Sequence, residues 1–174
     1  MTSTGELLLE HTRDVPDFPQ PGVLFKDLTP LFAAPKAFAT VVADVADRYR
    51  GRVDAVAGVE ARGFIIGGPV ALALGVPFVP VRKAGKLPGD TVQQTYDLEY
   101  GTATIEVHTG AFAAHRRALV LDDVLATGGT AAAACALVER AGGEVAGIEM
   151  LLELTFLGGR ELLSSYDVHA IAAV

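Results

Sequence analysis

Apolar runs of two kinds alternate along this chain. Runs rich in Val, Ile, Leu and Ala predict strands at 53–60, 77–83, 102–108, 117–123, 144–154 and 167–174. Longer apolar segments at 63–74 and 130–142 predict helices, with glycines at or just beyond their ends. Continuous apolar strands separated by helices indicate a parallel sheet that is covered on both faces. We therefore predict an α/β domain with a doubly wound, mainly parallel sheet flanked by helices.

Residues 82–101 interrupt this alternation. The segment is polar and contains Gly85, Pro88, Gly89 and Gly101. A loop of roughly 20 residues inside a compact domain is usually a functional lid or disordered. We therefore expect a flexible lid loop at about 82–101.

The composition limits the domain count and the class of partner. A chain of 174 residues with 51% hydrophobic residues is long enough for one core and short for two, so 1–174 is predicted to be a single domain. The net charge of −7 argues against a nucleic-acid binder. Cys135 is the only cysteine and has no internal partner, and the N-terminal residues lack the pattern of a signal peptide. We expect a cytoplasmic protein.

One uncharged run, 64–81, approaches the length of a membrane span. Gly75 and Pro77 would end a helix that begins near Gly63. A buried helix followed by a buried strand explains the run better, so no membrane association is expected.

The stretch RALVLDDVLATGGT, residues 117–130, runs from a buried strand into two acids and a turn of glycines and threonines. In open α/β sheets, ligands bind at the carboxyl ends of the strands. Backbone N–H groups at Gly128 and Gly129, with a helix N-terminus behind them, form a cradle for a phosphate. The lysine of a nucleotide P-loop is absent. Asp122 and Asp123 would repel a phosphate but suit vicinal ribose hydroxyls or a nearby cation; an ordinary strand-to-helix turn with solvated acids is the alternative.

Five stretches together carry a resemblance to a known family. VLDDVLATGGT is similar to the phosphoribosyl pyrophosphate (PRPP) signature of type I phosphoribosyltransferases. Four further stretches resemble the adenine-specific enzymes of that family and stand in the expected order: FPQPGVLFKDLTPLF, GVEARGF, VRKAGKLPG and YDLEYG. The resemblance covers residues 18–155. It implies an enzyme that makes AMP and diphosphate from adenine and PRPP, with a small N-terminal hood at about 1–35.

The resemblance implies a role for each matched stretch. Asp122 and Asp123 would hold the ribose hydroxyls. The 5′-phosphate would bind at Ala126, Thr127, Gly128, Gly129 and Thr130. The diphosphate would meet a loop at Glu60, Ala61 and Arg62, which in this family often contains a non-proline cis peptide, and the lid cations Arg82, Lys83 and Lys86. A structural Glu60–Arg62 ion pair and solvated lid cations are the alternatives.

The base and the metal are assigned in the same way. Phe25 would stack on the purine while the backbone of Leu24 and Lys26 reads its edge, although Phe25 could also be ordinary core packing. Glu99 would handle the proton of the base, and Tyr100 would pack over the closed site. Mg²⁺ would be held mainly through PRPP and diphosphate, with no direct protein ligand. The resemblance also implies a homodimer, in which the lid cations face the diphosphate, partly across the dimer interface.

Three alternatives to an adenine enzyme follow from the same stretches. A phosphoribosyltransferase for a 6-oxopurine or for orotate is the nearest of them. Enzymes for hypoxanthine and guanine usually carry Asp where this chain has Ala126, which favours adenine. A non-catalytic PRPP-sensing regulator would usually add a DNA-binding domain or lose the lid. A plain phosphate-binding module leaves the other four stretches unexplained.

Overall fold

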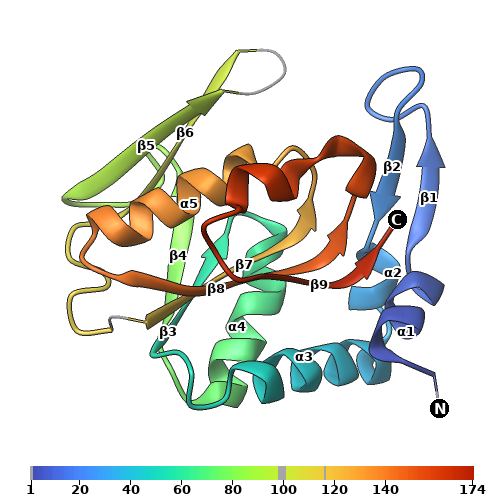
Figure 1. Cartoon of the computed structure of the whole chain (residues 1–174), viewed down its shortest axis with the longest axis horizontal. Helices are drawn as coiled ribbons and strands as arrows, with labels where there is room; N and C mark the ends of the chain where they lie inside the picture. Colours follow the sequence, from blue (N-terminus) through green and yellow to red (C-terminus); the bar gives the residue numbers. More distant parts are fainter. Residues whose placement is uncertain (1, 98–100, 116) are drawn as a thin grey trace.

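The computed structural model describes residues 2–97, 101–115 and 117–174. Among them, seven strands form one sheet in the order β5-β6-β4-β3-β7-β8-β9 (Figure 1). The strands are β3 (Ala55–Val59), β4 (Phe78–Lys83), β5 (Thr91–Asp97), β6 (Thr102–His108), β7 (Arg117–Leu125), β8 (Glu144–Glu153) and β9 (Val168–Ala173). The strands β4, β3, β7, β8 and β9 are parallel, whereas β5 and β6 are antiparallel to their neighbours. The predicted doubly wound, mainly parallel sheet is confirmed.

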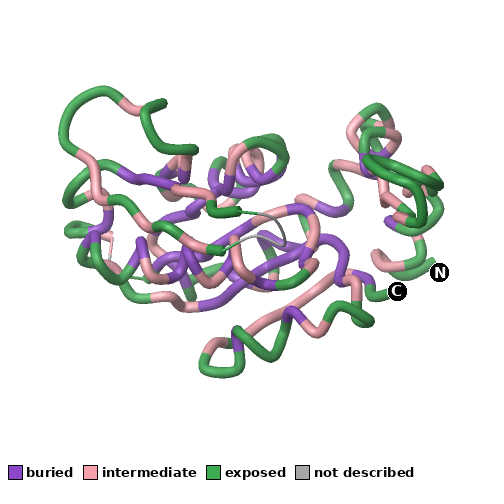
Figure 2. The backbone as a smooth tube through the Cα atoms, turned by 90° about the horizontal axis from the view of Figure 1, so that it is seen from above, coloured by how far each residue is buried: buried purple, intermediate pink, exposed green. Residues whose placement is uncertain are grey.

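Helices cover both faces of this sheet, with β3 and β7 buried between them (Figures 1 and 2). The helices are α1 (Thr4–Glu10), α2 (Thr29–Phe32), α3 (Pro35–Tyr49), α4 (Arg62–Leu74) and α5 (Gly129–Arg140), with short 3₁₀ turns η1 (Thr155–Leu157) and η2 (Gly159–Leu163). Buried side chains from α5 form one core cluster, and those from α3 and α4 form the other. The sheet is therefore apolar on both sides, as continuous apolar strands predict.

Helix α3 shows why one long helix escaped the sequence pattern. Its buried residues Val41, Val45 and Tyr49 recur every four positions and face the core, while Arg48 and Asp44 form an ion pair at 3.0 Å. Polar residues such as Lys36, Thr40 and Asp47 interrupt its apolar positions, so no continuous apolar run marks the helix. Pro35 occupies the first helical position, where its missing N–H costs nothing.

A two-stranded antiparallel sheet, β1 (Arg13–Pro16) with β2 (Leu24–Asp27), lies within the predicted hood and outside the main sheet (Figure 1). Two ion pairs link its strands, Arg13 with Asp27 at 2.5 Å and Lys26 with Asp14 at 2.7 Å. The N-terminal segment thus presents β2 as a separate ribbon near the carboxyl end of the main sheet.

The expectation of an irregular loop over 82–101 is wrong for much of that segment. Residues Thr91–Asp97 form β5, which pairs with β6 from Thr91 opposite His108 to Asp97 opposite Thr102. Partly buried and exposed side chains alternate along β5 after Val92. The pattern was missed because most of these residues are polar, and only Val92 and Tyr96 mark the inner face. Whether the segment acts as a lid stays a prediction.

The uncharged run at 64–81 forms most of α4 and then the start of β4, which confirms the helix-then-strand interpretation. Within the described ranges, no helix is both long and apolar enough to cross a bilayer.

Candidate functional site

A cavity of about 380 Å³ opens at the carboxyl ends of β3 and β7. These neighbouring parallel strands end at the same edge of the sheet, and each is followed by a turn into a helix. The cavity is lined by Glu60, Ala61, Arg62, Tyr96, Asp122, Asp123, Val124, Leu125, Ala126, Thr127, Gly128, Gly129, Thr130, Ala131 and Met150. Two stretches that are 60 residues apart in the sequence are therefore brought together, as the strand pattern predicts.

The turn after β7 is shaped by direct backbone packing. Gly128 has φ +86°, and a Cβ placed on it would lie 2.3 Å from the carbonyl oxygen of Gly159. A Cβ on Gly159 would lie 2.1 Å from the carbonyl oxygen of Ala126. Only glycine fits at either position, because the two backbones touch. The turn 126–130 is thus supported from behind by residues 158–159.

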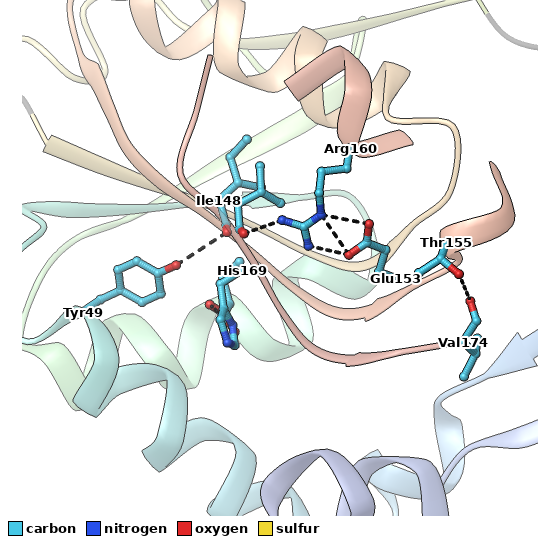
Figure 3. Close-up of polar contacts among 9 residues, drawn as sticks. Tyr49, Ile148, Glu153, Thr155, Arg160, His169 and Val174 are labelled. Atoms are coloured by element: carbon cyan, nitrogen blue, oxygen red, sulfur yellow. Dashed lines mark hydrogen bonds and ion pairs between the residues drawn. The ribbon is translucent and has the colours of Figure 1, made fainter. Parts of the chain in front are cut away.

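An ion pair at the end of β8 holds that supporting segment in place (Figure 3). The Arg160 guanidinium pairs with Glu153, and its Nε donates to both carboxylate oxygens, at 3.0 and 3.2 Å. Its Nη1 also donates to the carbonyl oxygen of Val168 at 2.6 Å. Thr155 donates to the carbonyl oxygen of Val174 at 2.8 Å, which ties the same segment to the last residue of the chain.

The two adjacent acids are in unequal surroundings. The carboxylate of Asp123 is only 6% exposed and pairs with the guanidinium of Arg62, the first residue of α4. Asp122 accepts a hydrogen bond from the backbone N–H of Asp123 at 2.9 Å. Burial, and then the negative charge of Asp123, raise the pKa of Asp122 well above its usual range. Asp122 is therefore a carboxyl group whose ionised form is poorly stabilised without a ligand.

The turn after β3 places Glu60 and Arg62 toward different partners. Glu60 accepts hydrogen bonds from the backbone N–H of Lys83 at 3.0 Å and from Nε of Arg82 at 3.2 Å, and these contacts lower its pKa. Arg62 pairs with Asp123, so the alternative of a Glu60–Arg62 ion pair is not what this structure shows. The peptide bond between Glu60 and Ala61 is cis, at the position that the family resemblance implies.

The predicted lid cations start at the end of β4. Arg82 bridges the Glu60 carboxylate and the carbonyl oxygen of Lys86, the latter at 3.1 Å. Lys83 lines a second cavity of about 330 Å³, which shares Glu60, Tyr96 and Thr130 with the first. No described carboxylate pairs with the ammonium groups of Lys83 or Lys86. Lys83 thus offers a positive charge at the second cavity, whereas Lys86 lines neither of the two cavities.

The predicted base-binding residues lie on β2, and none of them lines the first cavity. The half-buried ring of Phe25 faces the Arg62 guanidinium, with 5.6 Å from Cζ to the ring centroid, and packs edge-on against Phe18. Lys26 is engaged by Asp14. The structure therefore brings Phe25 next to the Arg62 side of the cavity, and it leaves Leu24 exposed.

Comparisons with known proteins agree with this arrangement. A family model for the phosphoribosyl transferase domain matches residues 28–162. An adenine phosphoribosyltransferase of Streptomyces coelicolor is 60% identical, covering 93% of this chain and 90% of its own. One from Thermobifida fusca is 53% identical, covering 99% of both chains. The chain belongs to the adenine phosphoribosyltransferase family.

A solved structure gives the same answer for the fold. Adenine phosphoribosyltransferase of Saccharomyces cerevisiae, complexed with adenine and an imino-altritol bisphosphate, superposes with a TM-score of 0.93. It is 38% identical, and the match covers 98% of this chain and 99% of that one.

Two residues that the family resemblance implies for the site lie outside the described residues. They are Glu99 and Tyr100, at the end of the segment that follows β5. The role expected for Glu99 in handling a proton of the base therefore stays a prediction.

Tyr96 is a polar lining residue that the sequence motifs do not reveal. It lies on β5, and its hydroxyl accepts a hydrogen bond from the Thr130 hydroxyl at 3.1 Å. The signal that could have found it is the alternation along Thr91–Asp97, which turns Val92 and Tyr96 toward the core. The polar composition of the segment predicts a loop, and a loop has no inner face.

The described residues contain no group of three or more His, Cys, Asp or Glu side chains arranged to hold a metal ion. The acids that line the first cavity are Glu60, Asp122 and Asp123. Carboxylate oxygens are donors that Mg²⁺ accepts, usually in combination with substrate phosphates and water. The donor set therefore fits a Mg²⁺ ion that arrives with a phosphate ligand.

Proposed function

We propose that this chain is a purine salvage enzyme that converts adenine and PRPP into AMP and diphosphate in the cavity at the carboxyl ends of β3 and β7. The observation that carries the proposal is the shared cavity of an acid pair, a glycine-threonine turn and an arginine at a helix N-terminus. These are the groups that ribose hydroxyls, a 5′-phosphate and a diphosphate require. Membership of the adenine phosphoribosyltransferase family supports the same reaction.

The turn 126–130 would bind the 5′-phosphate. Its backbone N–H groups lie at the N-terminus of α5, where the helix dipole favours an anion. The hydroxyls of Thr127 and Thr130 add two donors. The backing by Gly159 fixes the shape of this turn before the ligand arrives, so little ordering remains to be done on binding.

Asp122 and Asp123 would hold the ribose hydroxyls and favour the positive charge that develops on the sugar as diphosphate leaves. An anion near the developing oxocarbenium-like centre stabilises the transition state more than the neutral ground state. The raised pKa of Asp122 reports a carboxylate without enough favourable contacts in the free protein. A cationic transition state supplies the missing stabilisation.

Arg62, Arg82, Lys83 and Lys86 would receive the diphosphate, together with backbone groups at Glu60 and Ala61. The side chain of Arg62 is 44% exposed and pairs with Asp123 in the free protein. A diphosphate would compete for this guanidinium, because paired oxygens match its fork. We propose that Mg²⁺ is held mainly through PRPP and diphosphate, where it neutralises charge on the leaving group.

Adenine would bind on the hood side of the cavity, against Phe25 and the backbone of Leu24 and Lys26. Glu99 would accept the ring proton that adenine loses when the glycosidic bond forms. Ala126 cannot exchange a proton, which leaves this duty to a residue elsewhere and disfavours a 6-oxopurine. These assignments follow the family resemblance and the position of Phe25 beside Arg62.

A base-competition assay tests the reaction. Radiolabelled adenine, hypoxanthine, guanine and orotate are each incubated with PRPP and Mg²⁺, and nucleotide formation is measured. We expect AMP from adenine and no more than trace product from the other three. Product from hypoxanthine or orotate at a comparable rate would assign another base, and no product from any base would favour the PRPP-sensing regulator.

A homodimer and a cytoplasmic location belong to the same proposal. The family resemblance places lid cations near the partner's diphosphate, so Arg82 would act across the interface. Light scattering at micromolar concentration should give twice the mass of 18.1 kDa. A monomer with full activity would remove the cross-subunit role of Arg82. The buried, unpaired Cys135 is compatible with a reducing compartment.

A further inference from the structure

Tyr96 connects the β5–β6 hairpin to the turn that we assign to the 5′-phosphate. Its hydroxyl accepts a hydrogen bond from Oγ1 of Thr130 at 3.1 Å. Its ring lies against the first residue of α5, because a Cβ built on Gly129 would be 3.5 Å from the ring. Tyr96 also lines both the first cavity and the second, so it stands between them.

The position of Tyr96 is fixed from the other end of the same strand. Nη1 of Arg140, near the C-terminus of α5, donates to the carbonyl oxygen of Gln93 at 2.6 Å and to the side-chain oxygen of Gln94 at 3.0 Å. The strand β5 therefore lies along α5, and Figure 1 shows the hairpin beside that helix. Tyr96 is presented to the start of α5 by a strand that is anchored at both ends of the helix.

The hydroxyl chemistry at this contact depends on what the turn holds. A threonine hydroxyl has one proton to donate and accepts through its lone pairs, and a tyrosine hydroxyl does the same. In the free protein, Thr130 gives its proton to Tyr96. A phosphate in the turn offers only acceptor oxygens, so Thr130 must turn its proton toward the phosphate. Tyr96 then becomes the donor, and Thr130 becomes the acceptor.

We propose that Tyr96 is a positioning residue for the 5′-phosphate, acting through Thr130 by reversal of their hydrogen bond when phosphate binds. The Tyr96 hydroxyl then donates to Thr130 Oγ1, which donates to a phosphate oxygen. Hydrogen bonds in such a chain polarise one another, and the last one carries the charge of the phosphate. The inference rests on the proposed function, because it takes the turn 126–130 as the phosphate site.

The test compares ligands with and without the 5′-phosphate. Calorimetry gives the dissociation constants of AMP and adenosine for the wild type, Tyr96→Phe, Thr130→Val and the double variant. Tyr96→Phe keeps the ring and removes only the hydroxyl. Tyr166→Phe is the matched control, because the Tyr166 hydroxyl also bonds to α5, at Glu139 with 3.0 Å, away from the cavity.

We expect Tyr96→Phe to weaken AMP binding by about 3- to 10-fold, the usual effect of losing one hydrogen bond. Adenosine binding and the control should stay within about 2-fold, well below the loss of one such bond. In the Thr130→Val background, Tyr96→Phe should cause almost no further loss of AMP affinity, because the hydrogen bonds from Tyr96 through Thr130 to the phosphate are already broken. In steady-state assays, the KM for PRPP should rise while the KM for adenine does not.

Three results would overturn the inference. They are an unchanged AMP affinity in Tyr96→Phe, an equal loss for AMP and adenosine, and additive effects in the double variant. Each of these results overturns the inference provided that the wild type binds AMP more tightly than adenosine and that Thr130→Val reduces this difference. If the wild type binds AMP and adenosine equally well, the assignment of the phosphate site itself is wrong.

Discussion

Two carboxylates with few contacts in common, the buried Glu106 and the cavity-lining Asp122, show opposite ways of placing an acid in this protein. Glu106 on β6 is 1% exposed and accepts hydrogen bonds from the backbone N–H groups of Lys86 and Leu87, each at 2.9 Å. The hydroxyl of Thr91 and the amide of Gln93 donate to its other oxygen, at 3.2 and 3.0 Å. Burial raises the pKa of Glu106, but these donors outweigh it and lower the value to about 2.

Asp122 on β7 has the reverse balance. Its described donor is the backbone N–H of Asp123, and the charge of Asp123 lies beside it. Burial and that charge raise its pKa. A carboxylate whose oxygens all accept hydrogen bonds from the protein stabilises a turn. A carboxylate that lines a cavity and accepts few hydrogen bonds is available to a ligand. We therefore expect Glu106 to be structural and Asp122 to take part in the proposed reaction.

The largest effect is expected from a third acid, Glu99, which should behave like Asp122 and not like Glu106. Glu99→Gln keeps the size and hydrogen bonding of the side chain but removes its basicity. We expect kcat to fall by about 10²- to 10⁴-fold, with the binding of adenine and PRPP changed much less. Single-turnover kinetics should be used, so that product release does not hide the chemical step. A wild-type rate in this variant would make Glu99 a solvated surface charge.

The next effect concerns the acid pair itself. Asp122→Asn and Asp123→Asn should each lower kcat by roughly 10²-fold, because each removes a charge aimed at the developing cation. Asp122→Asn should at the same time unfold at a higher urea concentration at pH 7. Because the pKa of Asp122 is raised in the folded wild type, the wild type loses stability as pH rises through that pKa. The Asn side chain does not ionise, so the variant avoids this loss. A variant that is destabilised but fully active would contradict the ribose role.

A smaller effect is expected where no charge is touched. Gly159→Ala puts a methyl group 2.1 Å from the carbonyl oxygen of Ala126, so the phosphate turn must shift. A misplaced binding group commonly costs about 10-fold or more, and we expect such a loss in AMP affinity with adenosine binding unchanged. The control is Gly158→Ala, which strains a residue at φ +65° but meets only the side chain of Glu161. Equal losses in both variants would mean that general strain, not the turn, is responsible.

Glu106→Gln tests the structural member of the comparison. The Gln side chain keeps one acceptor oxygen, but its amide N–H groups would face hydrogen-bond donors that Glu106 now accepts from. Because those donors lose their acceptor, the free energy of unfolding should fall by about 1–3 kcal/mol. The lowered pKa means that the wild type holds this stability above pH 4.5 and loses it as pH falls toward 2. The variant should lack that acid sensitivity in urea titrations from pH 7 to 3. Folded Glu106→Gln should keep its kcat within about 3-fold of the wild-type value. A change of this size is smaller than the loss of one hydrogen bond to the transition state would cause.

The sequence predicted the parts of the fold that depend on continuous apolar runs. The strand 102–108 was correct to the residue, and the parallel core followed from strands such as 117–123, which the structure extends to Leu125. Elements marked only by a stripe were missed. These are α3, whose apolar positions are interrupted by polar residues, and β5, whose inner face has only Val92 and Tyr96 as apolar marks.

The sequence motifs predicted which stretches of the chain come together at the candidate site. Glu60, Arg62 and the stretch 122–130 were expected together, because neighbouring parallel strands end at one edge. Motifs do not specify which acid pairs with which cation, so the Arg62–Asp123 and Arg82–Glu60 pairs emerged only from the structure. The backing by Gly159 was also invisible, because a contact between two distant backbones leaves no mark in either local pattern.

The smallest effect is expected from Glu149, which separates a raised pKa from a catalytic role. Glu149 on β8 is fully buried, and burial raises its pKa, although His169, Arg48 and Tyr49 oppose this. His169 contacts it at 3.0 and 3.1 Å, and the Tyr49 hydroxyl also bonds to the carbonyl oxygen of Ile148 (Figure 3). Glu149 does not line the first cavity. A poorly stabilised acid therefore occurs here without access to a ligand.

Glu149→Gln should leave kcat and both KM values within about 2-fold of the wild type, because no hydrogen bond to a substrate is lost. Its effect should appear in stability as a function of pH. A raised pKa makes the folded wild type lose stability as pH rises from 4.5 through the folded pKa, and the variant should lack this component. Urea unfolding at pH 5 and pH 8 measures the difference, with Glu144→Gln, an exposed acid on the same strand, as the control. A large loss of activity in folded Glu149→Gln would show that access to the cavity is not what distinguishes Asp122 from a buried acid such as Glu149.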